Sequence, residues 1–444
     1  MDIVQTVTTS LQQLLGAQLD DLARECGLVR RQRKFTGQIL LRMLVVTLLR
    51  KPDASCWDFL VTATQLGLQV TPTAVAKRCA AGQPLVDFLR QALERALQQA
   101  VASEPAAAAL LQRFTAVFVG DSSTITLPDE LADAFPGCGG TAGTSRAALK
   151  IQVLWDLKTG RLERLLVEAG RASDAHSPIA LDQAEPGTLL VYDLGYFDVA
   201  RFAALDRQQA RFISRLQHGT TVYDADGVVL DLVAYLRRQP TGVVDVPILL
   251  GAAARLRCRL IGVRVPAEVA ARRRQQARDK ARDHGREPSA AYLELLGWTL
   301  FVTNCAAEEL SWRAVVVLYR ARWQIELLFK LWKSHNGLAR ARAGAAALER
   351  LALFYAKLLG VVLQHWLLLA TAWRGQRRSL LKGARVLRDE LKGLLLALDD
   401  AAALAAALRR LQELLQRLAQ VQARQKDPSH AQLLDDPELL DWLT

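Results

Sequence analysis

The sequence predicts a mixed α/β protein in which one mixed-sheet domain is interrupted by a β-rich insertion and flanked by helical regions. Three observations support this fold class. Apolar residues recur at helical spacing in residues 1–112, strand-type runs begin at 113, and a Leu- and Ala-rich helical pattern extends from 345 onward. A chain of 444 residues is too long for one ordinary core, so we expect two or three domains.

The N-terminal region, 1–112, is predicted to be a helical domain with a basic segment. Residues 83–100 form an amphipathic run, and seven Lys and Arg lie from Arg30 to Lys51 with no acidic residue among them. Thr71 is suited to cap a short helix that has Pro72 at its first position, which allows a helix-turn-helix element. A small helical domain with a solvated basic face explains these residues equally well.

The next region, 113–216, is predicted to be the first part of the mixed α/β domain. Its β-branched and apolar runs alternate with turn residues, as expected for a sheet. The expected elements are a strand at 113–121, a hairpin at 149–170, a strand at 188–193, a helix at 197–208 and a strand at 211–216.

Residues 217–296 are predicted to be the β-rich insertion. They contain short strand-like pieces and end in a basic run, 269–286, which either contacts a polyanion or forms a surface helix. The α/β domain resumes in 297–372, with a strand at its start and a long helix from Ser311, a suitable N-cap. The helical C-terminal region, 373–444, is a candidate dimerisation element.

Composition narrows the classes of function. The net charge of +12 suits a polyanionic partner, either nucleic acid or an anionic membrane surface. The six cysteines are scattered without a C-x₂-C pair, which predicts neither a zinc site nor disulfides and favours a reducing cytosol. The N-terminus has no signal-peptide pattern. The apolar stretch 351–373 is interrupted by Lys357, Gln364 and His365, so we expect a buried helix instead of a membrane span.

One segment, 319–333, carries a distinctive polar pattern. Its polar residues follow the spacing Y-x₂-R-x₃-E-x₆-K, and on a regular helix they lie within a sector of roughly 60°. They are Tyr319, Arg322, Glu326 and Lys333, with Lys330 at the margin of the sector. An acid between cations is typical of a site that binds a metal ion and phosphates. A solvated, charged helix face is the alternative.

Two further acids follow predicted strands. Asp121 comes after the apolar residues VFVG, and Asp193 comes after LLVY. If the two strands are neighbours, both carboxylates project at the same end of the sheet, where Glu326 can join them. Three carboxylates are hard ligands suited to divalent cations such as Mg²⁺. Capping or turn carboxylates are the alternative interpretation of the two aspartates.

Together these segments resemble a known family. DSSTITLP at 121–128, VYDLGYFD at 191–198 and YRARWQIELLFKLWKS at 319–334 are similar to the three signature regions of bacterial insertion-sequence transposases. That family belongs to the RNase H-like DDE class, in the branch with the Tyr-Arg-Glu-Lys motif. The resemblance covers most of the chain. It implies an RNase H-like catalytic domain, split by the insertion, and a DNA-binding role for 1–112.

The resemblance also implies roles for individual residues. Asp121, Asp193 and Glu326 would be the catalytic residues and would bind the metal, Mg²⁺ or Mn²⁺ in its place. Tyr319, Arg322 and Lys333 would contact DNA phosphates, with Lys330 a weaker candidate. Trp298 would hold a base flipped out of the transposon end, although an ordinary core position explains it equally well.

The implied function is that of a DNA transposase, which cuts transposon ends and transfers the strands into target DNA. The family reaction is cut-and-paste through hairpin ends. The implied partners are double-stranded DNA and a second copy of the chain, without a membrane, in the bacterial cytoplasm at the nucleoid. The alternatives are a catalytically silent DNA-binding repressor, a nuclease without strand transfer and, if 351–373 inserted, a membrane-associated protein.

Overall fold

The computed structural model divides into two compact units, each built from several segments of the chain. The first unit comprises Met1–Ala107, Ser122–Ala172 and Gln324–Gln422. The second unit comprises Ala108–Asp121, Ser173–Trp323 and Ala423–Thr444. The structure describes residues 2–30, 34–139, 145–179, 184–283, 285–340, 342, 344–372, 378–421 and 428–440. The five-part division predicted from the sequence stays a prediction.

The first unit begins with six helices, as the sequence predicts for this region. They are α1 (Ile3–Leu14), α2 (Gln18–Glu25), α3 (Gly37–Arg50), α4 (Cys56–Gln65), α5 (Pro72–Cys79) and α6 (Gln83–Leu97). Side chains satisfy the free N–H groups at several helix starts. Thr71 accepts a hydrogen bond from Ala74 N at the start of α5, and Ser55 forms a capping box with Asp58 at the start of α4. The predicted Thr71 cap is confirmed.

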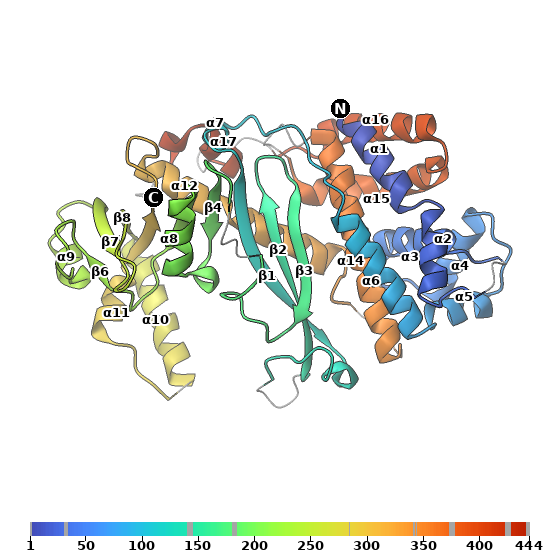
Figure 1. Cartoon of the computed structure of the whole chain (residues 1–444), viewed down its shortest axis with the longest axis horizontal. Helices are drawn as coiled ribbons and strands as arrows, with labels where there is room; N and C mark the ends of the chain where they lie inside the picture. Colours follow the sequence, from blue (N-terminus) through green and yellow to red (C-terminus); the bar gives the residue numbers. More distant parts are fainter. Residues whose placement is uncertain are drawn as a thin grey trace. The chain divides into compact units, whose positions relative to one another are not determined.

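Helix α14 (Ala347–Ala372) is the central helix of the first unit (Figure 1). It packs against α3, α6, α1 and α16 (Ala401–Leu418), and α15 (Leu380–Ala397) packs beside α16. By length and composition, residues Ala347–Ala370 are apolar enough to cross a membrane, but the most apolar 18-residue window of this helix is entirely buried inside the protein. Burial on all sides is typical of a core helix, as predicted for 351–373.

A long hairpin completes the first unit. Strands β2 (Ala147–Asp156) and β3 (Leu162–Ala169) pair antiparallel, and β2 also neighbours β1 (Val117–Leu127) in the order β3-β2-β1. The short 3₁₀ helix η1 (Asp129–Leu131) follows β1. The predicted hairpin is confirmed. The prediction that the first strand ends at Asp121 is wrong, because Thr124, Ile125 and Thr126 are good strand formers and continue β1.

The second unit contains a mixed sheet in the order β1-β4-β5-β9-β8-β7-β6. Its strands beyond β1 are β4 (Leu189–Tyr192), β5 (Arg211–Arg215), β6 (Val222–Tyr223), β7 (Val243–Leu250), β8 (Leu256–Arg264) and β9 (Trp298–Thr303). Strands β1, β4 and β5 run parallel, and the remaining neighbours are antiparallel. The parallel strands β4 and β5 are linked by α8 (Val199–Arg207), as a parallel pair requires.

The insertion extends this sheet. Strands β6, β7 and β8 add to its edge through β9, and three helices accompany them: α9 (Leu232–Arg237), α10 (Ala267–Asp283) and α11 (Ala290–Leu295). The basic run predicted at 269–286 largely coincides with α10. Within α10, all of whose residues are described, Ala270 is the one buried residue, so the helix is mostly a solvated surface element.

The remaining described helices of the second unit are α12 (Trp312–Ala321) and four short ones. The short ones are α7 (Ala109–Gln112), η2 (Leu194–Tyr196), α17 (His430–Asp435) and η4 (Pro437–Leu439). Helix α17 packs against both α12 and α7, so the C-terminal end of the chain belongs to the same unit as the parallel strands. The predicted cap is confirmed, since Ser311 accepts a hydrogen bond from Ala314 N.

Candidate active site

Two aspartates stand side by side on neighbouring parallel strands. The register of β1 and β4 pairs Val117 with Leu189 and Val119 with Val191. The same register, continued two residues further, sets Asp121 beside Asp193. Residues in register on neighbouring strands point to the same face of a sheet, so we expect both carboxylates to share one face.

The carboxylate of Asp193 is not used as a helix cap. Asp193 follows the fully buried strand β4 and precedes η2, but its side chain makes no capping hydrogen bond with that turn. By contrast, Asp198 caps α8 by accepting hydrogen bonds from Ala200 N and Arg201 N. Two nearby aspartates therefore differ in role, and the Asp193 carboxylate is left to side chains from another helix.

Helix α12 supplies those side chains. The Tyr319 hydroxyl donates a hydrogen bond to Asp193 Oδ1 at 3.2 Å. Arg322, the C-cap of α12, approaches Asp121 with 3.4 Å between Nη1 and Oδ2. The Arg322 and Asp121 side chains are 13% and 21% exposed, so solvent screens the ion pair less than it would screen a surface pair. The structure thus brings together four of the residues predicted from the sequence.

The environment of Tyr319 keeps its hydroxyl protonated. Burial, followed by the negative charge of Asp193, raises the pKa of Tyr319 to about 12. The Arg322 guanidinium lies 5.7 Å from the centre of the Tyr319 ring. Phe301 packs against the same ring in a T-shaped arrangement, with 5.0 Å between the two ring centres. The phenol therefore acts as a hydrogen-bond donor and leaves the negative charge on the aspartate.

The predicted long helix from Ser311 is divided into three parts. Helix α12 ends at Ala321, α13 spans Trp323–Lys330, and a π-helical turn, η3, spans Leu331–His335. The prediction that one regular helix carries all four motif residues is therefore wrong. The hydrogen bond from Asn336 N to Leu331 O, at 3.0 Å, is the wider type that defines a π turn. The predicted apolar face is confirmed, since Ile325, Leu328, Leu331 and Trp332 are all buried.

Within the first unit, Glu326 and Lys333 occupy different parts of this segment. Glu326 is half-buried in the first turn of α13, and Lys330 is exposed at its end. Lys333, in η3, donates to Ser123 Oγ at 3.2 Å and to Thr124 O at 3.0 Å. Both acceptors belong to β1, just after Asp121 in the chain. Among the described residues, no three acidic, histidine or cysteine side chains are grouped closely enough to hold a metal ion.

Comparison with known proteins decides the family. The family model for the transposase DDE domain matches residues 112–359, which is more than half of the chain. The chain belongs to the transposase DDE domain family. It is therefore an enzyme that acts on DNA, and this family depends on a divalent metal.

Named relatives agree with this assignment. The transposase for insertion sequence element IS231F of Bacillus thuringiensis subsp. israelensis is 29% identical over 339 residues, which cover 71% of this chain and 70% of that protein. The transposase for IS1151 of Clostridium perfringens is 25% identical over 270 residues, 56% of each chain. A putative transposase, InsL for IS186A of Escherichia coli (strain K12), is 32% identical over 163 residues, 35% of this chain and 44% of that one.

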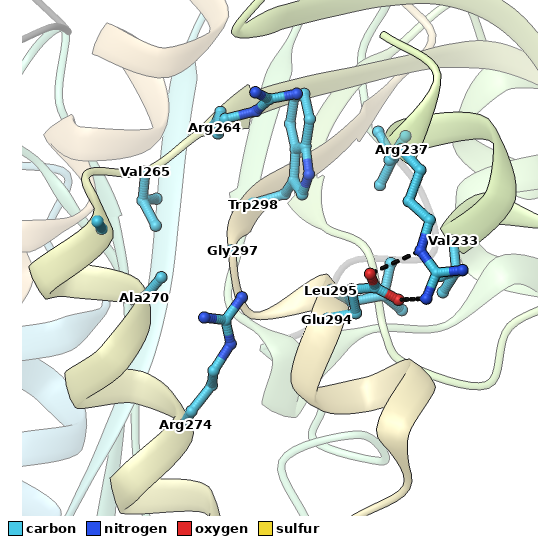
Figure 2. A pocket seen from close by; sticks show the side chains of 12 residues that line it. Val233, Arg237, Arg264, Val265, Ala270, Arg274, Glu294, Leu295, Gly297 and Trp298 are labelled. Atoms are coloured by element: carbon cyan, nitrogen blue, oxygen red, sulfur yellow. Dashed lines mark hydrogen bonds and ion pairs between the residues drawn. The ribbon is translucent and has the colours of Figure 1, made fainter.

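The transposase has a second candidate site, a pocket of about 420 Å³ in the second unit (Figure 2). Trp298 lines this pocket and is only 9% exposed. The Arg264 guanidinium covers the indole ring at 4.8 Å from its centre. Arg264 stands directly opposite Trp298 in the register of β8 and β9. A flat cationic group stacked on an indole is a surface on which a nucleobase can also stack.

Polar side chains from α9, α10 and α11 line the rest of the pocket. Figure 2 shows Arg237 of α9 joined to Glu294 of α11 by an ion pair, and Arg274 of α10 pointing toward Gly297. Arg274 Nε donates to Leu293 O at 2.9 Å. Sequence reasoning identified Trp298 but missed Arg264, Arg237 and Glu294. The strand pattern around Arg264 was visible in the sequence. Its pairing with Trp298 was not, because α10 and α11 separate β8 from β9 in the chain and no local pattern sets the register of the two strands.

Proposed function

We propose that this transposase excises an insertion sequence by cutting DNA at its ends and joins the freed 3′ ends to target DNA. The pairing of Asp121 and Asp193 on neighbouring parallel strands carries this proposal. Tyr319 and Arg322 orient those two carboxylates, which suits a site for phosphoryl transfer. Family resemblance supports cut-and-paste transposition through hairpin ends.

We infer that the required divalent metal is Mg²⁺, with Mn²⁺ able to replace it. Asp121, Asp193 and Glu326 would hold it. Their oxygen donors fit a hard cation, and neither histidine nor cysteine is needed. When bound, such an ion would lower the pKa of the attacking water and stabilise the leaving 3′ oxygen.

The cationic side chains would bind and orient the DNA backbone. Arg322 approaches Asp121, and Lys333 donates to Ser123, which lies two residues later on β1. Both are cationic side-chain types that bind phosphate oxygens. Tyr319, protonated because its pKa is about 12, would donate a hydrogen bond to Asp193 or to a phosphate oxygen at any pH of the reaction. Lys330, which is exposed, would add only a weak electrostatic contact.

The Trp298 pocket would receive a base flipped out of the transposon end. Its volume of about 420 Å³ lies in the range of small-ligand sites. The stacked Arg264 and Trp298 would hold the base by its flat face, while Arg274 and the Arg237–Glu294 pair provide polar groups for its edges.

Two copies of the chain are expected to act together, because two transposon ends must be cut and joined in one complex. The helical C-terminal region is the candidate interface. We place the reaction in the bacterial cytoplasm at the nucleoid, where both donor and target DNA are found.

The metal site is tested with Asp193→Asn and Glu326→Gln, assayed on DNA carrying the element's own ends in Mg²⁺ or EDTA. We expect the unaltered protein to cut at the element boundary only with Mg²⁺. Both variants should bind these ends but cut at least about 1,000-fold more slowly. Asp198→Asn is the matched control, because Asn also caps helices well and Asp198 caps α8.

The outcomes separate the competing functions. Insertion products in target DNA would establish strand transfer, whereas cutting without insertion would indicate a nuclease. If the unaltered protein binds the ends but never cuts them with any divalent metal, the proposal is wrong and a repressor role replaces it. Equal activity of Glu326→Gln and the unaltered protein would exclude Glu326 from the metal site.

A further inference from the structure

The chain leaves the Tyr-Arg-Glu-Lys segment through an irregular turn. The π-helical turn η3 carries Lys333 and is followed by its C-cap, Asn336, and Gly337 then adopts a positive φ of 56°. A helix end leaves carbonyl groups without partners inside the helix. The direction of Lys333 depends on how this turn is held, since one residue of rotation in a helix moves a side chain by about 100°.

Buried polar groups of α14 hold this turn. Lys357, only 4% exposed, donates from Nζ to Gly337 O at 2.9 Å and to Arg340 O at 2.7 Å. Gln364 and Asn336, 4% and 2% exposed, form a reciprocal amide pair with distances of 2.9 and 3.3 Å. Lys357 and Gln364 are seven residues apart on α14, so they lie on one face of the helix.

Two more contacts fix the same turn, one from helix α15 and one from the loop between α3 and α4. Arg388 of α15 donates from Nη2 to His335 O at 3.2 Å. Gly337 packs so closely on Pro52 that a Cβ atom at Gly337 would lie 2.5 Å from the Pro52 Cβ. Four separate contacts therefore constrain residues 335–340.

Stability alone does not explain why α14 carries a buried ammonium at this position. Most other described residues of the helix are apolar and buried, and an apolar side chain at such a position usually stabilises a core at least as well as a buried ammonium. Burial lowers the pKa of Lys357 to about 8, which reflects this cost. A buried charge that fixes one backbone conformation is better explained by a requirement for that conformation.

We propose that Lys357, together with the Asn336–Gln364 pair, is a positioning residue for transposition that sets the direction of Lys333. This inference rests on the proposed contact between Lys333 and DNA phosphate. Lys357 does not touch DNA in the proposed role. It holds the carbonyls that end the catalytic segment, so that the Lys333 ammonium stays beside Ser123 and Thr124.

The test is a double-mutant cycle in the full-length protein, with Lys333→Ala and Lys357→Met. The affinity for end DNA is measured over a series of salt concentrations. Lys333→Ala should weaken binding about ten-fold and reduce the salt slope by about one, as expected for one lost phosphate contact. Lys357→Met should weaken binding about five-fold with a similar change in slope, and it should have no further effect when Lys333 is already Ala.

Controls distinguish positioning from damage to the fold. Lys382→Met is matched, because exposed Lys382 also donates to a backbone carbonyl, Gln420 O, but far along the chain from the turn. It should change neither affinity nor slope. Lys357→Arg should restore most of the affinity. If Lys357→Met fails to fold, Gln364→Glu replaces it in the same cycle, because it alters the amide pair with almost no change in volume.

Each outcome has a distinct meaning. If Lys333→Ala changes neither affinity nor slope, the proposed DNA contact of Lys333 is wrong. If Lys333→Ala behaves as expected but the effects of the two substitutions add, Lys357 acts independently of Lys333 and the positioning role is wrong. Loss of the Lys357→Met effect in the Lys333→Ala background supports the role.

Discussion

The two ends of the Tyr-Arg-Glu-Lys segment are held in place by different interactions. At the first end, Tyr319 and Arg322 contact Asp193 and Asp121 directly through their own side chains. At the other end, Lys333 lies in a π turn that is held by buried groups of α14. A single sequence motif with fixed spacing therefore depends on direct pairing at one end and on an indirect scaffold at the other.

Because the two ends are held differently, substitutions at each end should affect different measurements, either the cleavage rate or the free energy of unfolding. Substitutions at the Tyr-Arg end remove a group from the site and should alter cleavage more than stability. Changes in the α14 scaffold act through the backbone and should alter stability as well.

We expect acid to destabilise the packing of α14 and to leave the contacts of Tyr319 and Arg322 unchanged. His365 of α14 is buried and donates from Nε2 to Gly160 O at 2.6 Å, and burial lowers its pKa to about 4. In the unfolded chain this imidazole has a pKa near 6.5, so below that pH the unfolded state binds a proton that the folded state does not. The contribution of neutral His365 to stability is therefore fully present above pH 6.5 and is lost as the pH falls to about 4. The expected loss is about 3 kcal/mol from this group.

Urea unfolding at pH 7 and pH 4 measures the effect of His365. His365→Gln should be less sensitive to acid than the unaltered protein by about this amount. Equal acid sensitivity of the two proteins would show that His365 does not titrate in this way.

Removing the guanidinium at the other end should slow the chemistry. Arg322→Ala deletes a charge-assisted contact with Asp121 and is expected to reduce the cleavage rate about 100-fold. Thermal unfolding should change little. Arg320→Ala is the matched control, because Arg320 is exposed two residues earlier on α12. A similar loss of rate in both variants would contradict a specific role for Arg322.

The turn after η3 should not tolerate a side chain at Gly337. Gly337→Ala combines a positive φ with a Cβ only 2.5 Å from Pro52. Gly344→Ala also has a positive φ, of 72°, but no atom within 4 Å of the added carbon. Gly337→Ala should therefore lower the free energy of unfolding about 2 kcal/mol more than Gly344→Ala. Equal losses in urea unfolding would mean that the turn adjusts freely.

The smallest effect is expected for the Tyr319 hydroxyl. Tyr319→Phe removes one hydrogen bond to Asp193 and should reduce the cleavage rate about five-fold, or roughly 1 kcal/mol. Because burial and Asp193 raise the pKa of Tyr319 to about 12, the ratio of the two rates should be constant from pH 6 to 9. A ratio that changes across this range would indicate that the phenol exchanges its proton during the reaction.

Local signals in the sequence were sufficient for most individual elements. Thr71 and Ser311 mark helix starts because their hydroxyls accept hydrogen bonds from N–H groups three residues later. The buried strand before Asp193 and the hairpin at 149–170 follow from runs of apolar and β-branched residues. These features depend on neighbours in the chain, so a single sequence determines them.

Features that depend on distant partners were decided by the fold. Strand β1 continues past Asp121, and the insertion joins the existing sheet through β9 instead of forming a separate one. The break at Arg322 and the π turn replace a regular helix that the spacing alone predicted. No local pattern specifies these outcomes, because they depend on what packs against each segment.

The family and the order and spacing of the acids and cations can be recognised in the sequence. Which of these groups meet depends on how the chain folds. Tyr319 contacts an aspartate 126 residues away, and Arg322 contacts one 201 residues away. Such contacts arise from strand register and helix packing, so motif spacing can identify the participants but cannot specify their pairing.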